Sequence, residues 1–330
     1  MTAVPVERVP LALAPRGRPP AARPRRRRPR RERLEYLVLR AAAGMLGVIP
    51  LWLALRLGEL GALLVYLVDV PHRRVGMQNL ALAFPERSLR QRRRILRRSF
   101  LNLGRMAAEL AHLPRLSPKR LREMVRFEDE EWWREAVTWE RSTGVLVLSG
   151  HFGNWELLVF AQGMRGHPVH MVHRALANPL IDRWLNELRA RAGTRMIRKS
   201  AGAGGVLQAL HERALLVLPI DQNSTRGLGV FVDFFGVPAS TNAGMARIAL
   251  RMDAPIVPVF IVRDGRGARH RVRVLPILQV ERTGDPDEDV RRNTERFTAV
   301  FEEMVRRHPD HWLWMHKRWK TRPRGAPRIY

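Results

Sequence analysis

Short apolar runs alternate with helix-like patterns through the second half of the chain. The predicted strands are Val145–Leu148, Val169–Val172, Met196–Arg198, Leu215–Ile220, Ile256–Val262 and His270–Leu278. Between and after them, apolar residues recur at the spacing of one helix face. The predicted helices are Trp155–Met164, Leu180–Ala192, Val206–Glu212, Gly244–Met252 and Val290–Arg307. This alternation predicts an α/β fold with a mostly parallel central sheet flanked by helices.

Residues 34–70 contain long apolar runs instead of short alternating ones. The longest run without a charge, Ala41–Leu55, is shorter than the roughly 20 residues that cross a bilayer. Extending it back to Tyr36 reaches that length but includes Arg40, and a second apolar run follows at Leu60–Val68. We therefore expect an N-terminal membrane-associated helical segment at 34–70, as a span, a hairpin or in-plane helices. The alternative is a soluble amphipathic helix that packs on the core.

Residues 71–330 are expected to form the main folded domain, which begins with helices at 72–116. Arginines crowd residues 87–98, whereas the apolar residues Leu89, Ile95 and Phe100 fall mostly on another helix face. Such a helix either contacts lipid headgroups or simply faces solvent. A further helix is predicted at Leu121–Trp139.

Composition and charge limit the class of partner. A chain of 330 residues suits one large domain, and its net charge of +28 favours anionic partners: membranes, phosphorylated substrates, acidic proteins or nucleic acid. Residues 1–33 are rich in arginine and proline and are predicted to be a disordered leader. The chain has no cysteine, which excludes disulfides, thiol catalysis and Cys-ligated zinc and fits a reducing cytosolic location.

The most informative stretch is the first predicted strand and the glycine turn after it. His151 and Glu156 follow that strand where a helix begins, which is where open α/β sheets place their active sites. A histidine there can take a proton from a substrate hydroxyl, and a carboxylate can fix its tautomer. The pair is a candidate hydroxyl-activating dyad. The alternative is a helix-capping His151 and a solvated Glu156.

Two more polar residues follow predicted strands. Arg174 could hold a phosphate or stabilise an oxyanion, or it could be an ordinary surface arginine. Asp221 ends a very apolar strand and could support Arg174 or His151, or bind loop amides. Trp312, Trp314 and Trp319 could stack on bases, lie at a membrane interface or pack on the core, of which packing is the most frequent. No residues fall at convincing metal-ligand spacing, so no metal is expected.

Five blocks in this order resemble the late acyltransferases of lipid A biosynthesis, a family within the glycerolipid acyltransferase superfamily. They are His151–Glu156, Val172–Arg174 with Asn178, Pro179 and Asp182, Asp221–Asn223, Phe234–Thr241 and Trp312–Lys320. The first is a His-x4-Glu motif. The resemblance extends from about Tyr36 to Pro323 and leaves out the arginine-rich leader.

The resemblance implies an O-acyltransferase on the cytoplasmic face of the bacterial inner membrane. It would move a fatty acyl chain from acyl carrier protein to the hydroxyl of a 3-hydroxyacyl chain on a phosphorylated glucosamine disaccharide, with no cofactor. His151 would be the general base and Glu156 its support, with Arg174, Asp221 and Asn154 as substrate-binding or oxyanion residues. Its partners would be acyl carrier protein, a glycolipid acceptor and an anionic membrane surface, with no nucleic acid.

Two other functions fit parts of the pattern. A lysophospholipid or other glycolipid acyltransferase of the same superfamily would use the same dyad with a different acceptor pocket. A non-enzymatic basic protein that binds membrane or nucleic acid would explain the charge but not His151 and Glu156 at a strand end.

Overall fold

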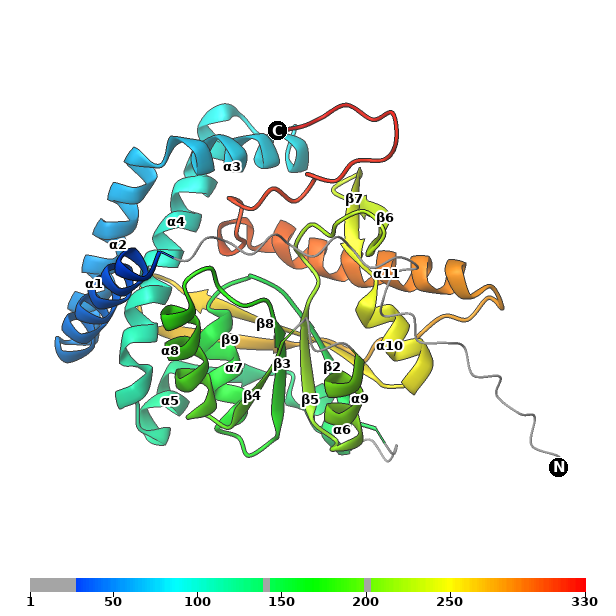
Figure 1. Ribbon diagram of the computed structural model, residues 1–330, viewed down its shortest axis with the longest axis horizontal. Helices are drawn as coiled ribbons and strands as arrows, with labels where there is room; N and C mark the ends of the chain where they lie inside the picture. Colours follow the sequence, from blue (N-terminus) through cyan, green and yellow to red (C-terminus); the bar gives the residue numbers. More distant parts are fainter. Residues whose placement is uncertain (1–27, 139–142, 199–202) are drawn as a thin grey trace.

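The computed structural model describes residues 28–138, 143–198 and 203–330. Its main sheet has seven strands in the order β1-β9-β8-β2-β5-β3-β4 (Figure 1). They are β1 Val125–Glu128, β2 Val145–Ser149, β3 Val169–His173, β4 Thr194–Arg198, β5 Leu215–Pro219, β8 Ile256–Asp264 and β9 Arg269–Val274. All neighbouring pairs are parallel except β8 and β9. The predicted α/β fold with a mostly parallel sheet is confirmed.

Strand β2 lies near the centre of the sheet and is buried along its whole length. Its side chains alternate between two apolar cores: Leu146 and Leu148 face one, and Val145 and Val147 face the other. The first core is covered by α9 Ala203–His211, α10 Gly244–Met252 and α11 Pro286–Arg307. The second is covered by α5 Pro118–Met124, α6 Glu130–Thr138, α7 Trp155–Gly163 and α8 Pro179–Ala190. Helices therefore flank both faces, as the sequence predicts.

The structure corrects one predicted helix and adds one hairpin. The segment Leu121–Trp139 is not one helix, because Val125–Glu128 leaves α5 to pair with β9 as an edge strand. A two-stranded antiparallel sheet, β6 Gly229–Phe234 and β7 Val237–Asn242, was not predicted. Its turn places Phe235 and Gly236 at positive φ, and β6 packs against α11. The edge strand depends on long-range pairing with β9, whereas the hairpin depends on a local two-residue turn and on packing against α11.

The described part of the chain begins with four helices, α1 Pro29–Val48, α2 Leu51–Val68, α3 Val70–Ala83 and α4 Leu89–His112. A short 3-10 turn, Leu113–Arg115, follows α4 and leads to α5. The charge-free run Ala41–Leu55 is not one helix, since α1 ends before Pro50 and α2 begins after it. Residues 29–33, assigned to the leader from sequence, are the first turns of α1. The rest of the predicted leader, 1–27, lies outside the described residues.

Helices α2 and α4 cross at unusually close range. A Cβ on Gly104 would lie 2.1 Å from the Gly58 carbonyl oxygen, so the contact requires glycine.

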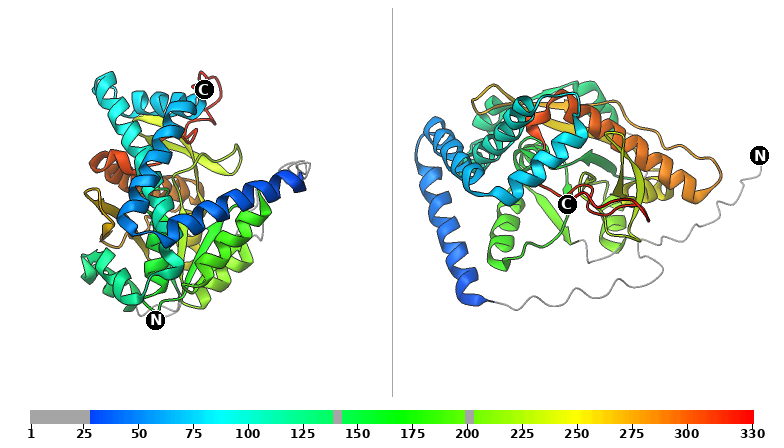
Figure 2. Two further views of the ribbon diagram at one scale, coloured as in Figure 1. Left: turned by 90° about the vertical axis from the view of Figure 1, so that its left-hand side faces the viewer. Right: turned by 90° about the horizontal axis from the view of Figure 1, so that it is seen from above.

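Among the described residues, α2 is the one helix long and apolar enough to cross a membrane, and little of it is buried. Figure 2 shows α1 and α2 at the margin of the molecule. The exposed large apolar residues on them are Leu34, Leu37, Val38, Met45, Val48, Trp52, Leu57, Leu60, Leu64, Val65, Leu67 and Val68.

Candidate active site

His151 and Asp221 meet where two neighbouring parallel strands end. The register of β2 and β5 pairs Ser149 with Pro219, and each polar residue follows two positions later. His151 Nδ1 lies 3.0 Å from Asp221 Oδ1, and the His151 backbone N–H donates to Oδ2 at 3.1 Å. The carboxylate therefore holds both the ring and the backbone of His151.

Gly150 makes this approach possible. A Cβ at position 150 would lie 2.8 Å from Asp221 Cγ and 2.4 Å from the ring of Phe301. Any side chain there would force the carboxylate or the ring away. The residue before the histidine is therefore glycine for reasons of space.

The surroundings of His151 favour a proton on Nδ1 and leave Nε2 for the substrate. Asp221 accepts from Nδ1, so Nε2 is the acceptor nitrogen of the neutral ring, and the Gln222 amide lies 3.2 Å from it. Burial opposes the charged ring, but the charge and hydrogen bond of Asp221, with the charge of Glu156, raise the pKa of His151 above its usual value. The same contacts outweigh burial at the carboxyl and hold the pKa of Asp221 at about 2. This arrangement suits a histidine that acts as a base beside a carboxylate that stays ionised.

Glu156 lies close by but has another direct partner. Its carboxylate forms a two-point ion pair with Arg189 of α8, with Nη2–Oε1 at 2.5 Å and Nε–Oε2 at 2.8 Å, and also accepts from Trp155 Nε1 at 3.2 Å. Glu156 and Arg189 both act on His151 through their charges. The structure therefore gives the direct bond to Nδ1 to Asp221 and leaves Glu156 as an electrostatic neighbour.

Sequence reasoning missed Arg189. It lies on a correctly predicted helix, but the chain has so many arginines that nothing in the sequence marks this one. Its signal is structural: its side chain is nearly buried and paired with a buried carboxylate beside His151.

The two other candidates lie apart from His151 and Asp221, which together form the dyad of this site. Arg174 is exposed at the end of β3 and lines the cleft in front of His151. Asn154 is buried and caps α7: its Oδ1 accepts from Leu157 N–H at 3.0 Å, and its Nδ2 donates to Glu109 at 2.7 Å. Asn154 does not line the cleft, so its contacts describe a positioning role rather than an oxyanion donor.

A cleft of about 1080 Å³ opens onto His151. One part of its wall is apolar, from Ile197, Val206, Leu218, Ile220, Met245 and Ile248. The cationic side chains on its lining are Arg174, Arg189, Arg198 and Arg247. A neighbouring cavity of about 750 Å³ shares Arg198 and Asp182 with it. An apolar wall beside cations suits a ligand with both a hydrocarbon chain and an anionic group.

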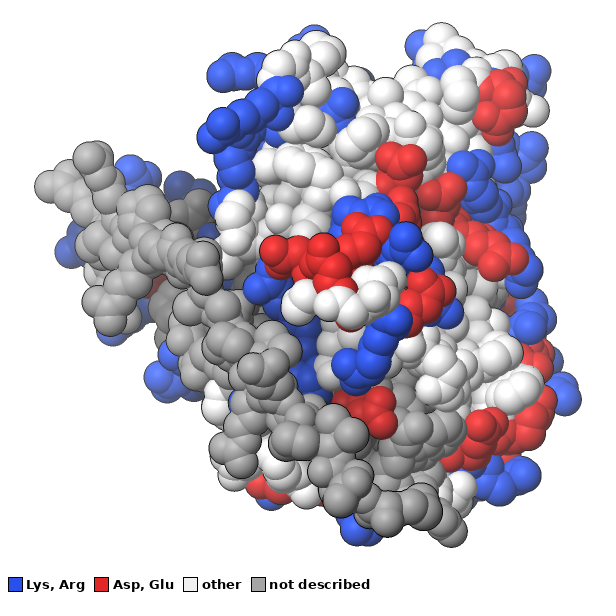
Figure 3. Space-filling model, turned by 90° about the vertical axis from the view of Figure 1, so that its right-hand side faces the viewer, with Lys and Arg blue, Asp and Glu red and all other residues white. Residues whose placement is uncertain are grey.

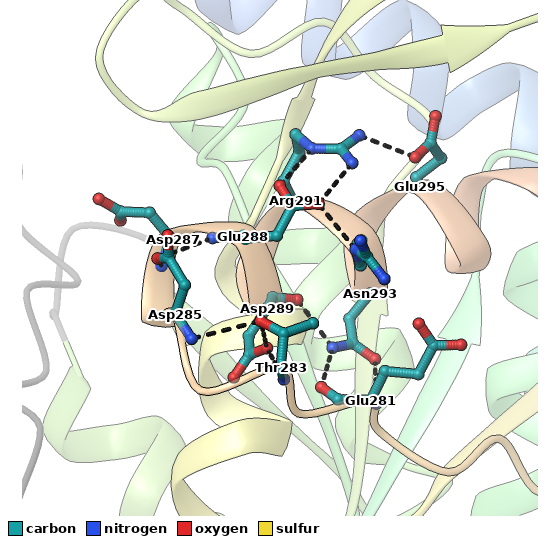
Figure 4. A network of polar contacts seen from close by, with 10 residues as sticks. Glu281, Thr283, Asp285, Asp287, Glu288, Asp289, Arg291, Asn293 and Glu295 are labelled. Carbon is teal, nitrogen blue, oxygen red and sulfur yellow. Dashed lines mark hydrogen bonds and ion pairs between the residues drawn. The ribbon is translucent and has the colours of Figure 1, made fainter.

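A cluster of charged residues at the start of α11 has structural partners. At the start of α11, Asp285 caps the helix, Asp289 accepts from Thr283, and Glu288 pairs with Arg291 and Arg292 (Figure 4). The face that includes this cluster shows acidic and basic side chains side by side (Figure 3). No group of residues suited to a metal ion occurs among the described residues.

Comparison with known proteins decides the family. The family model described as bacterial lipid A biosynthesis acyltransferase matches residues 23–321. The chain belongs to this family. The acyltransferase is therefore an enzyme of lipid A biosynthesis, as the five sequence blocks indicate, and the alternative of a non-enzymatic basic protein is set aside.

Relatives of this acyltransferase carry the same kind of name. It is 28% identical to the lipid A biosynthesis lauroyltransferase of Escherichia coli over 77% of this chain and 80% of that protein. It is 26% identical to the palmitoleoyltransferase of the same organism, over 78% of this chain and 81% of that one. A solved 1-acyl-sn-glycerophosphate acyltransferase from Thermotoga maritima is 12% identical, with a TM-score of 0.35 over 72% of this chain and 97% of that one.

We expect the acyltransferase to lose activity in acid as His151 becomes charged. A base must be neutral, and its raised pKa puts the loss above pH 6.5, the ordinary value for histidine. A profile of kcat/KM against pH should therefore rise through a pKa above 6.5 and then level off. In Asp221→Asn the lost anion should move that rise to lower pH and reduce the plateau. A wild-type profile that is level down to pH 6 would contradict this assignment.

Proposed function

We propose that this acyltransferase moves a fatty acyl chain from acyl carrier protein to a hydroxyl of a lipid A precursor, at the cytoplasmic face of the bacterial inner membrane. The observation that carries the chemistry is the bond between half-buried His151 and buried Asp221 at the end of a cleft with an apolar wall and several arginines. Family membership supports the acceptor class, since the related proteins are lipid A acyltransferases.

The reaction needs one proton carrier and no covalent enzyme intermediate. His151 Nε2 takes the proton of the acceptor hydroxyl as its oxygen attacks the thioester carbonyl. Asp221 stabilises the imidazolium that forms. The tetrahedral intermediate then collapses with cleavage of the C–S bond, and His151 returns the proton to the departing thiolate. The products are the ester on the acceptor and the free thiol of the carrier.

Charges around the dyad support the intermediate. The Glu156 carboxylate favours the charged form of His151, and Arg189 holds Glu156 in place. Arg174, on the cleft lining, is the candidate donor to the oxyanion or to a phosphate of the acceptor. The apolar wall of the cleft would hold an acyl chain, and the arginines would hold phosphate.

The N-terminal helices support membrane attachment. Helix α2 could span or lie in the bilayer, and α1 adds exposed apolar side chains near it. Arg90, Arg93, Arg94 and Arg97 of α4 are exposed, whereas Ile95 and Leu96 are buried, so this helix offers a basic face. Apolar area inserted into lipid and arginines at the headgroups would act together.

The donor is tested by comparing two thioesters. Acyl carrier protein is small and acidic, so a chain of charge +28 should attract it over long distances, and added salt should weaken that attraction. We expect kcat/KM to be higher with acyl carrier protein than with coenzyme A carrying the same acyl chain, and to fall as ionic strength rises. Equal or better use of acyl coenzyme A would contradict the donor assignment and leave the dyad intact.

A further inference from the structure

The C-terminal strap, residues Pro309–Trp319, lies directly over the dyad. Leu313 N–H donates to the His151 carbonyl at 3.2 Å, and Gly153 N–H donates to the His311 carbonyl at 2.8 Å. Between these bonds, Phe152 and Trp312 form an antiparallel bridge. The strap therefore holds the backbone on both sides of Phe152, directly after the catalytic histidine.

The strap also contacts the other member of the dyad. Trp312 Nε1 donates to Asp221 Oδ2 at 3.0 Å, on the oxygen that also receives His151 N–H. Both side chains are buried, with Trp312 1% and Asp221 3% exposed. The Asp221 carboxylate thus has three donors: Nδ1 and N–H of His151, and the Trp312 indole. A buried carboxylate with this many donors is held in one orientation.

Trp312 is itself fixed from two other helices. Ser99 of α4 donates to the Trp312 carbonyl at 2.6 Å, and Asn79 of α3 donates to the carbonyls of Trp314 and His316 at 2.7 Å each. The Trp312 ring packs edge-on against Phe234 and Trp314, with centroids 5.3 and 4.6 Å away. The indole N–H is therefore positioned before any substrate binds.

The other two strap tryptophans donate to backbone carbonyls. Trp314 Nε1 donates to Pro309 at 2.6 Å, and Trp319 Nε1 donates to Val237 at 3.2 Å. All three rings are buried, which confirms core packing for this motif and excludes the base-stacking and membrane-interface interpretations. Packing explains Trp314 and Trp319 fully, but it leaves the Trp312–Asp221 bond unexplained.

We propose that Trp312 is a positioning residue of the acyl transfer: its indole N–H fixes the Asp221 carboxylate in the orientation that accepts Nδ1–H of His151. This rests on the proposed role of His151 as the base. When His151 takes the substrate proton, a carboxylate already in place stabilises the imidazolium without first rotating. The bond from Trp312 also lowers the pKa of Asp221, although burial opposes it, so the carboxyl stays ionised.

Other titratable side chains face His151 and Asp221, and the substitutions in the test below leave these side chains unchanged. Glu156 and Arg189 come from α7 and α8, and His316 and Arg318 come from the strap. Burial lowers the pKa of His316 to about 4, and its Nε2 accepts from Asn223 N–H at 2.9 Å. His316 is thus neutral in the range where His151 titrates.

The test compares Trp312→Phe with Trp314→Phe, a matched control that loses an indole N–H from a buried ring of the same strap. We expect Trp312→Phe to lower kcat by about 10- to 100-fold with little change in KM, the size of effect seen for partners that orient a metal-bound histidine. Without the indole N–H, the carboxylate is no longer held in the orientation that accepts Nδ1–H, so Asp221 stabilises the imidazolium less. The acid limb of the kcat profile should therefore move to lower pH, in the same direction as in Asp221→Asn. Trp314→Phe should do neither. An acid limb that is unmoved, or moved no more than in Trp314→Phe, would overturn the proposal.

A second measurement needs no active enzyme and no folded Trp312 variant. The chain has nine tryptophans, so indole 15N labelling of the full-length wild-type protein gives nine N–H signals. Because the Trp155 ring packs edge-on against the His151 ring, with centroids 5.2 Å apart, the titration is followed in Trp155→Phe, which removes that indole. We expect one of the remaining signals to be shifted downfield, to change as His151 titrates, and to lose that response when Asp221→Asn is added. If no indole signal follows His151, Trp312 is only a packing residue. Because this readout is independent of turnover, its failure is distinct from failure of the acyl-transfer assay.

Discussion

His151→Ala is expected to lower kcat by about 10²- to 10⁴-fold, because it removes the general base at the head of the cleft. The protein should stay folded. Asp221 keeps the Trp312 indole and the backbone N–H of residue 151 as donors, so the carboxylate is not stranded. Single-turnover rates with saturating donor and acceptor measure the chemical step, and thermal unfolding reports the fold.

The matched control is His72→Ala. His72 is an exposed histidine that contacts Asp69, another imidazole–carboxylate pair but remote from the cleft. Its loss should leave kcat within about twofold of wild type, as expected for a surface change. A His151→Ala protein that keeps near full activity would remove the proposed mechanism.

Glu109→Ala is expected to destabilise the protein by about 3–5 kcal/mol, the usual cost of removing one partner from a buried ionic group. Glu109 is 0% exposed and accepts from both Nη atoms of Arg263 at 2.6 Å, from His270 Nε2 at 2.9 Å and from Asn154 at 2.7 Å. Its removal leaves four donor groups, on three buried residues, without this acceptor. Urea unfolding at neutral pH measures the loss.

The same network has a defined pH dependence. Burial raises the pKa of Glu109, but His270 and Arg263 outweigh it and hold that pKa at about 2, below its ordinary 4.5. Because the folded pKa is depressed, this stabilisation is present above pH 4.5 and is lost as the pH falls toward 2. The difference in stability between wild type and Glu109→Ala should therefore shrink in acid.

Glu303→Ala is the control for Glu109→Ala. Glu303 pairs with Arg307 one helical turn away, and both side chains are more than half exposed. Its loss should change stability by about 0.5 kcal/mol or less. Equal destabilisation by the two substitutions would mean that the buried network does not hold α4, β8 and the N-terminus of α7 together.

The sequence predicts where the site lies because its residues come directly after the carboxyl ends of two strands. His151 and Asp221 each come just after an apolar run, and parallel pairing of β2 with β5 then brings them together. The direct contact between them could not be assigned from sequence, because Asp221 had two possible partners and Glu156 was nearer along the chain. The pairing of Glu156 with Arg189 depends on how α7 packs against α8, which no local pattern encodes.

In the fold, too, the elements that depend on distant contacts could not be predicted from local patterns. Strands and helices with clear periodicity are found nearly where expected, whereas β1 exists only because β9 is there to pair with it. The C-terminal strap has almost no regular structure, yet its hydrogen bonds to α3, α4 and the dyad fix it. Its role could not be read from the spacing of its tryptophans, since packing and donation to a carboxylate use the same residue type.

The most direct test of the central claim is mass spectrometry of purified protein incubated with acyl carrier protein carrying a labelled chain and a lipid A precursor. Two acceptors are compared, one with 3-hydroxyacyl chains and one identical except that the 3-hydroxyls are absent. We predict that wild-type protein transfers the labelled acyl group to the hydroxylated precursor and that His151→Ala does so far more slowly. The acceptor without 3-hydroxyls should gain no label with either protein. Equal acylation of both precursors, or transfer to lysophospholipid and to neither precursor, would contradict this prediction.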